Sequence, residues 1–243
     1  MRFGTRVALA IFALMLFAGF VSLGTWQVER RSWKLDLIER VEQRAHARPV
    51  AAPDEPAWPS VTAANDEYRR VALSGTFLHE KEALVQASTE LGAGFWVITP
   101  LQRQNGTIVL VNRGYVPEAR RARDTRVAFE PLGETSVTGL LRITEPEGGF
   151  LRQNDPQADR WFSRDVAAIA QSRGLSRVAP YFVDAQPAAV AGDRAPRPWP
   201  VAGLTVISFH NSHAVYAITW YILALMVVAA ALLVVRHERR RHS

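Results

Sequence analysis

The chain has 243 residues, with 29 Lys and Arg against 23 Asp and Glu and a formal net charge of +6. It contains no cysteine, which excludes disulfides, thiolate metal sites, iron–sulfur clusters and cysteine nucleophiles. Nucleic-acid binding is not indicated, because no reader module is visible and much of the basic excess lies beside two apolar runs, where it suits anionic lipid.

The first apolar run extends from Val7 to Leu23 and is flanked by arginines. About 20 apolar residues of helix span the roughly 30 Å of a bilayer's hydrocarbon core. A secretory signal peptide has similar features, but small residues of a cleavage site do not follow here. Trp26 instead suits an anchor at the membrane interface. We therefore expect a cytoplasmic segment over residues 1–6 and a retained transmembrane helix over residues 7–25.

Residues 30–59 lead from this run to the folded domain. Trp33, Leu37 and Val41 recur with helical spacing, which predicts that the first helix continues beyond the membrane. Residues 51–59 contain three prolines, a composition typical of a linker. The globular domain is therefore expected to begin near Tyr68.

The centre of the chain holds short apolar runs bounded by turn residues, which predict β-strands. Asn105-Gly106 predicts a type I′ hairpin turn, in which both residues have positive φ. In that register Pro100 has no N–H to give, so the ladder is expected to end there or to lie at an edge. The predicted strands are Tyr68–Leu73, Phe77–Gln86, Phe95–Leu101, Thr107–Asn112, Val137–Ile143 and Tyr181–Asp184.

One helix is predicted before the last of these strands. Ser163 is expected to cap it, Asp165 suits the N-terminal end of its dipole, and Gly174 closes it. Residues 186–200, rich in proline and alanine, are expected to form a loop. The pattern predicts an α+β fold: a mostly antiparallel sheet domain over residues 26–212 with one or two helices, held by two transmembrane helices.

The second apolar run, Ala214–Val235, is charge-free and is followed by an arginine-rich tail. It predicts a transmembrane helix over residues 213–235 and a cytoplasmic tail over residues 236–243, since basic residues favour the cytoplasmic side. The basic residues within 30–44 argue for the opposite orientation. Long domains translocate largely regardless of charge, so the tail decides, and the main domain is expected to be extracytoplasmic.

Common catalytic signatures are absent from the sequence: there is no G-x-S-x-G, H-E-x-x-H, P-loop or G-x-G-x-x-G motif. Gly92-Ala93-Gly94 lacks the third glycine and a strand-to-helix context, so it predicts a turn. Carboxylates are scattered through the domain without a pair that the sequence alone brings together. An enzyme is therefore not expected.

The second apolar run begins beside two histidines, His210 and His213. Helical spacing places His213, Tyr216 and Trp220 on one stripe at the membrane edge. One interpretation is an aromatic interfacial belt with a hydrated histidine, which needs no ligand. The other is a porphyrin site, in which an imidazole ligates haem iron and flat aromatic rings pack on the macrocycle.

Several motifs occur in order along the chain. Together they resemble the Surfeit locus cytochrome oxidase biogenesis family over nearly the whole length. One departure is Tyr115, which stands where that family has tryptophan, a mild aromatic exchange. The motifs are G-x-W-Q-x-x-R-x-x-x-K within Leu23–Lys34, Asn-Arg-Gly-Tyr-Val-Pro within Val111–Pro117 and N-x-H-x-x-Y-A-x-T-W over Asn211–Trp220, with Gly75–Phe77 and Asn154–Trp161 also fitting.

This resemblance implies an assembly factor for haem-copper terminal oxidases that helps deliver or hold haem a for subunit I. It implies His213 as the axial iron ligand. Tyr216 and Trp220, on the same helical stripe, are expected to line that pocket, and Trp26 is expected to form a further wall because both span ends meet the same surface. Oxidase subunit I, the haem a delivery machinery and membrane lipid are the expected partners. The expected location is the cell inner membrane, as a multi-pass protein with its main domain in the periplasm.

Two rival functions stay open from the sequence. One is a cofactor-free scaffold that only grips oxidase subunits. The other is a membrane-anchored hydrolase, which needs a catalytic cluster assembled in space.

Overall fold

The computed structural model describes residues 3–146, 148–149, 152–187, 199–204 and 212–240. The chain divides into two compact units. The helical unit contains residues 1–40 and 208–243, and the barrel unit contains Val41–Ile207. His210, Asn211 and most of the predicted loop over 186–200 lie outside the described residues.

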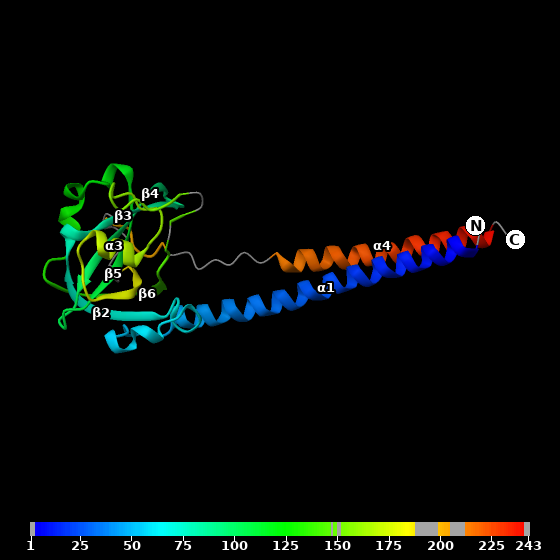
Figure 1. Cartoon of the computed structure of the whole chain (residues 1–243), viewed down its shortest axis with the longest axis horizontal. Helices are drawn as coiled ribbons and strands as arrows, with labels where there is room; N and C mark the ends of the chain where they lie inside the picture. Colours follow the sequence, from blue (N-terminus) through cyan, green and yellow to red (C-terminus); the bar gives the residue numbers. More distant parts are fainter. Residues whose placement is uncertain (1–2, 147, 150–151, 188–198, 205–211, 241–243) are drawn as a thin grey trace, which may run out of the picture. The chain divides into compact units, whose positions relative to one another are not determined.

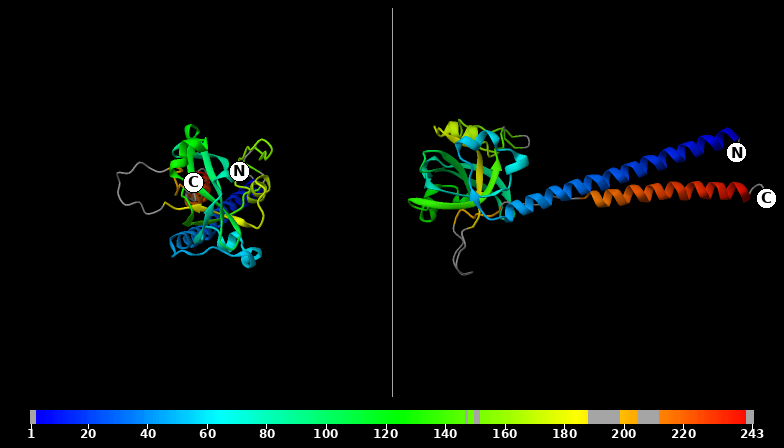
Figure 2. Two further views of the ribbon diagram at one scale, coloured as in Figure 1. Left: turned by 90° about the vertical axis from the view of Figure 1, so that its left-hand side faces the viewer. Right: turned by 90° about the horizontal axis from the view of Figure 1, so that it is seen from below.

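The helical unit is built from two long apolar helices, α1 (Phe3–His46) and α4 (His213–Arg240). They lie side by side and antiparallel, so that the start of α1 and the end of α4 are at the same end of the pair (Figures 1 and 2). Both helices are long and apolar enough to cross a membrane. The predicted continuation of the first helix is confirmed, because α1 runs without a break to His46.

The barrel unit contains a seven-stranded sheet in the order β1-β2-β6-β7-β5-β4-β3. Because β2 also pairs with β4, strands β2, β6, β7, β5 and β4 form a closed ring. Only β1–β2 and β5–β7 are parallel among the described pairs, which confirms the predicted α+β fold with a mostly antiparallel sheet. The strands are β1 (Val50–Ala51), β2 (Arg70–Phe77), β3 (Ala83–Thr89), β4 (Gly92–Gln102), β5 (Ile108–Pro117), β6 (Glu134–Ile143) and β7 (Val178–Ala185).

Short helices fill the connections between strands. The helix α3, labelled in Figure 1, packs against β7. The helices of this unit are α2 (Ala63–Asp66) and α3 (Val166–Ser172), with 3-10 turns η1 (Glu55–Ser60), η2 (His79–Lys81), η3 (Glu118–Arg120) and η4 (Arg123–Phe129).

Strand β5 is buried on both faces, which explains its continuous apolar sequence. Val109 and Val111 belong to the cluster that fills the barrel, together with Tyr181 of β7. Leu110 points to the other face and joins a second cluster with Ile169 of α3. A parallel pair such as β5–β7 is normally covered on both sides in this way. Each buried aliphatic side chain contributes roughly 1.5–3 kcal/mol.

The β4–β5 turn differs from the predicted type I′ turn. Gly106 has a φ of 76°, whereas Asn105 is not among the described residues with positive φ. Gly106 N donates to Arg103 O at 2.9 Å and Arg103 N donates to Thr107 O at 2.9 Å. This is a three-residue loop in which glycine supplies the left-handed residue. Asn105 acts through its side chain instead, since its Oδ1 accepts from Thr107 N at 3.0 Å.

Of the two outcomes expected for Pro100, an end of the ladder at this residue is wrong. Pairing of β4 with β5 continues beyond it to Gln102 and Ile108. The carbonyl oxygen of Pro100 accepts from Leu78 N at 2.8 Å, on the edge away from β5. Backbone N and O of one strand residue face the same edge. The missing N–H therefore costs β5 no hydrogen bond.

The boundary between helix and domain lies earlier than Tyr68. Val41, Ala45 and Ala52 are all buried, and Ala52 belongs to the barrel core. Residues 50–51 pair with β2 and residues 55–60 form η1, so 51–59 is not a linker. Its prolines are compatible with the 3-10 turn η1. The segment is folded on itself, since Trp58 Nε1 donates to Pro53 O at 3.2 Å.

Two further expectations about local structure are corrected. The predicted strand Phe77–Gln86 is interrupted by η2, which separates β2 from β3. The cap of α3 is Asp165, whose Oδ1 accepts from Ala168 N at 3.1 Å. Ser163 lies before the helix and its hydroxyl donates to Glu145 O at 2.7 Å. The Asp165 carboxylate therefore accepts from an N–H group of the first turn that has no partner within the helix, which is the role predicted for the Ser163 hydroxyl.

Candidate functional site

His213 is the first residue of α4 and is half-buried. Backbone hydrogen bonds from Val215 N and Tyr216 N to Ser212 O open the helix at this point. The ring Nδ1 lies 2.7 Å from Oε1 of Gln27 on α1. A polar contact between two apolar helices is uncommon enough to mark this end of the pair as a candidate site.

One face of α4 packs against α1. Ala217 and Ala224 on this face are 5% and 3% exposed, which follows from close helix approach at small residues. Trp220, between them, stacks on Phe20 with ring centroids 5.8 Å apart and an interplanar angle of 25°. His213 therefore begins a stripe in which positions i, i+4, i+7 and i+11 face α1.

A glycine on α1 lets the helices approach. A Cβ at Gly24 would lie 2.8 Å from the ring of Tyr221, closer than a real side chain tolerates. The neighbouring Thr25 Oγ1 lies 3.2 Å from the hydroxyl of Tyr221. The contacts of this end of the helical unit thus come from Phe20, Gly24, Thr25 and Gln27.

The structure brings together only part of the predicted stripe. His213 and Trp220 both contact α1. Tyr216 is 53% exposed and Trp26 is also 53% exposed, so neither is enclosed in the helical unit. Sequence reasoning missed Gln27 and Tyr221. The sequence carries only part of the signal: Gln27 follows Gly24 by three positions and thus shares its helical face, but the spacing does not show what that face contacts.

The donor set fits a haem better than a bare metal ion. Among the described residues no group of three or more His, Cys, Asp and Glu side chains is placed to hold a metal ion. Haem iron needs only one or two protein ligands, since the porphyrin supplies the other four. A single imidazole beside exposed Val215, Tyr216 and Ile218 offers one axial nitrogen and an apolar surface.

The far end of the helical unit is apolar. A groove of about 350 Å³ lies between the two helices, lined by Leu9, Phe12 and Leu16 of α1 and Val227 and Val234 of α4, among others. It offers no polar group to a ligand. The chemistry of the unit is therefore concentrated where His213 meets Gln27.

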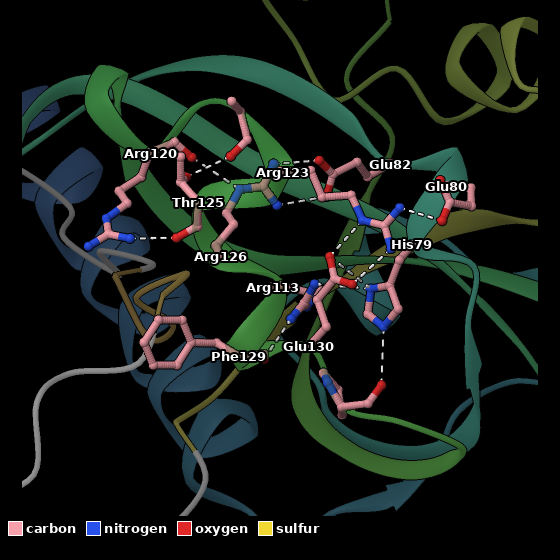
Figure 3. Close-up of polar contacts among 12 residues, drawn as sticks. His79, Glu80, Glu82, Arg113, Arg120, Arg123, Thr125, Arg126, Phe129 and Glu130 are labelled. Carbon is pink, nitrogen blue, oxygen red and sulfur yellow. Dashed lines mark hydrogen bonds and ion pairs between the residues drawn. The ribbon is translucent and has the colours of Figure 1, made fainter.

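The barrel unit contains a buried charge cluster around its β5–β6 connection (Figure 3). Arg126 is 1% exposed, donates to Glu82 Oε2 at 2.8 Å and also donates to the carbonyls of Arg120 and Arg121. The bond to Glu82 ties the connection to the barrel, and the two carbonyl bonds join parts of the connection to each other. The cluster holds a loop in place, as a satisfied buried network does.

The centre of that cluster is Arg113 (Figure 3). Its Nη2 donates to Phe129 O at 3.2 Å and its Nη1 lies 3.3 Å from Nδ1 of His79. Burial lowers the pKa of Arg113, against the opposite effect of Glu130 and Glu82. The hydrogen bond from Arg123 holds the pKa of Glu130 below its usual value. These partners are charged and main-chain groups, an arrangement typical of a structural network.

The Asn-Arg-Gly motif has a second structural task. Asn112 donates to Asp184 Oδ1 at 2.8 Å, and its own Oδ1 accepts from Gly114 N at 3.1 Å. Gly114 has a φ of 130°, and a Cβ there would meet Val201 O at 2.3 Å. Asp184 is 2% exposed and also binds Arg142 and Arg164. The motif therefore organises the barrel wall.

Comparison with known proteins places these motifs in a family. The model of the SURF1 family matches residues 14–225 of the chain. Surfeit locus protein 1 of Homo sapiens is 36% identical over 219 residues, covering 82% of this chain and 68% of that protein. The mouse protein of the same name is 35% identical over 228 residues, with 86% and 70% covered. The Takifugu rubripes protein is 35% identical over 230 residues, with 86% and 90% covered.

Proposed function

The chain belongs to the SURF1 family of cytochrome oxidase assembly factors, and we propose that it holds haem a at the membrane edge and passes it to oxidase subunit I. In this proposal, haem a is the molecule that the protein carries and transfers. The observation that carries the proposal is His213, an imidazole fixed by Gln27 at the start of an apolar helix.

His213 is the proposed axial ligand, through Nε2. Trp220 joins α4 to α1 by its stacking on Phe20, two helical turns after His213, and exposed Tyr216 offers an aromatic surface to the macrocycle. The chain supplies one imidazole and no second ligand from the described cluster of α1 and α4 side chains. Single-point attachment suits a cargo that must leave, because two strong axial ligands hold iron more tightly than one.

The proposed location is the cell inner membrane, with both termini in the cytoplasm and the barrel in the periplasm. Support comes from two helices of sufficient length and from the basic residues that end α4, Arg236, Arg239 and Arg240. A reporter fused after Ser243 should be active only on the cytoplasmic side. Activity on the outer side would overturn this topology.

The cofactor-free scaffold that grips oxidase subunits remains the rival function, because it needs no ligand at His213. A membrane-anchored hydrolase has less support. Among the described barrel histidines, His79 bonds Arg113 and Pro131 O, and His46 bonds Glu42, so the recorded partners include no serine or threonine hydroxyl.

An absorbance spectrum of the full-length protein, purified from cells that make haem a, tests the proposal. The wild type should carry a haem a spectrum, and His213→Ala should lose or strongly shift it while remaining in the membrane. His237→Ala is the matched control, since His237 lies at the other end of the same helix. Unchanged haem affinity in His213→Ala would refute the assignment of His213 as the iron ligand. Haem-free protein that still binds subunit I would establish the scaffold function.

A further inference from the structure

Gln27 lies opposite the candidate ligand, on the face of α1 that also carries Phe20 and Gly24. Its Oε1 is 2.7 Å from Nδ1 of His213. An amide oxygen can only accept a hydrogen bond, so this contact is a hydrogen bond in the tautomer that has its hydrogen on Nδ1. The lone pair of the neutral imidazole is then on Nε2. This contact thus favours one orientation of the ring and one tautomer.

We propose that Gln27 is a positioning residue for His213: it selects the Nδ1–H tautomer, in which Nε2 is the nitrogen that ligates iron. The part that concerns iron rests on the proposed haem function, whereas the tautomer is a property of the protein alone. Hydrogen-bond partners of a ligating histidine commonly orient the ring and fix its tautomer, and their loss costs about 10–100-fold in affinity.

The chemical type of the partner also has a consequence. A carboxylate at this position would draw the Nδ1 proton strongly and make the ring a more basic ligand. The amide of Gln27 is neutral and polarises the ring less. Gln27 therefore keeps His213 aligned while leaving the iron–nitrogen bond weaker than a carboxylate partner would. That combination suits a carrier that must release its cargo.

A contact elsewhere in the same interface separates positioning from simple helix pairing. Thr25 Oγ1 and the Tyr221 hydroxyl, 3.2 Å apart, also join α1 to α4 but do not involve His213. Thr25→Val removes that contact and preserves side-chain volume. Gln27→Leu removes the acceptor of His213 in the same way. If Gln27 only held the helices together, the two variants would behave alike.

The first measurement needs no haem. Nitrogen-15 NMR of the full-length protein in detergent, with labelled histidine and the His213 signals assigned by their loss in His213→Ala, reports which ring nitrogen is protonated. We expect Nδ1–H in the wild type, in Thr25→Val and in Gln27→Glu, and a shift toward Nε2–H in Gln27→Leu. A wild-type ring protonated on Nε2 would overturn the proposal, since Gln27 would then donate through its amide nitrogen.

The second measurement is a titration with isolated haem a. Gln27→Leu should bind at least about 10-fold more weakly than wild type, and Thr25→Val should bind unchanged. Gln27→Glu should bind ferric haem more tightly and lower its midpoint potential, a change that a merely structural role does not produce. Equal weakening in Gln27→Leu and Thr25→Val would overturn the positioning role.

The two proposals fail in different ways. Haem binding that depends on His213 but not on Gln27 refutes the inference and leaves the proposed function standing. Wild-type protein that binds no haem refutes the proposed function, and the NMR result still decides whether Gln27 selects the tautomer.

Discussion

The two units of this protein treat polar groups in opposite ways. In the barrel unit, buried charged groups are numerous and are joined in networks, as with Arg126 and Glu82 or Asp184 with Arg142 and Arg164. In the helical unit, α1 and α4 are joined by stacked and small side chains together with the polar pairs Gln27–His213 and Thr25–Tyr221. In the barrel unit, the buried polar side chains hold strands and loops together.

The difference shows where a functional group is to be sought. A buried arginine in the barrel has a complete structural explanation, because removing it leaves its carboxylate partner buried and unpaired. An imidazole between two apolar helices has no such explanation, since packing alone would stabilise the pair. A polar contact between two apolar helices is therefore more informative about function than a denser charge cluster in the barrel unit.

The largest effect is expected in the barrel. Arg126→Ala should destabilise the protein by about 3–5 kcal/mol, because it leaves Glu82 largely buried without its partner. Chemical denaturation followed by the barrel's tryptophan fluorescence measures this. Arg160→Ala is the control: Arg160 is 64% exposed in its pair with Asp155, so its loss should cost less than about 1 kcal/mol. Equal losses would mean that the charge cluster is not structural.

The next effect concerns alkaline pH. Burial raises the pKa of Tyr181 to about 12 from its usual 10.0, and its hydroxyl donates to Pro53 O at 2.7 Å. The unfolded chain loses this proton first, so the stabilisation is fully present below pH 10 and is lost as pH rises to 12. The loss is roughly 3 kcal/mol, at about 1.4 kcal/mol per pH unit. Tyr181→Phe should flatten this part of the pH–stability curve, and an unaltered slope would contradict the assignment.

A smaller effect is expected in the helical unit. Gly24→Val should push the Tyr221 ring away from α1 at a cost of about 1–3 kcal/mol. The chain has no cysteine, so Phe20→Cys with Trp220→Cys can be joined by a short thiol cross-linker, and Gly24→Val should lower the yield. Gly19→Val is the matched control, since nothing lies within 4 Å of its Cβ position. A yield unaffected by Gly24→Val would show that the glycine does not set the approach.

The sequence predicted the elements better than their junctions. Two apolar runs, the continuation of α1 to His46 and the strand-rich α+β domain all follow from local periodicity. The start of the domain did not, because Ala52 and Trp58 pack in a core formed by distant strands. The turn at Gly106 was misassigned since Asn105 bonds through its side chain, which the dipeptide alone does not reveal.

The candidate site was predicted in part for a related reason. The helical period places His213 and Trp220 on one stripe, and both contact α1. The partner of His213 could not be derived, because the register between two helices far apart in the chain depends on their packing. Gly24 and Gln27 share a face of α1, yet only the packed pair shows that Gln27 meets the imidazole.

The ring of strands closes only when β7 pairs with both β6 and β5, so the barrel cannot fold until β7 has been synthesised. Strand β7 lies between β6 and β5, and its parallel register joins Ile108 to Val178. Until Ala185 has left the ribosome, β5 and β6 each present an unpaired edge of apolar strand, the kind of surface that aggregates. Long-range pairing of this type is also slow to form. A stop codon anywhere between residues 117 and 178 therefore does more than remove α4: it leaves an open sheet that cannot bury Leu110 or Val111.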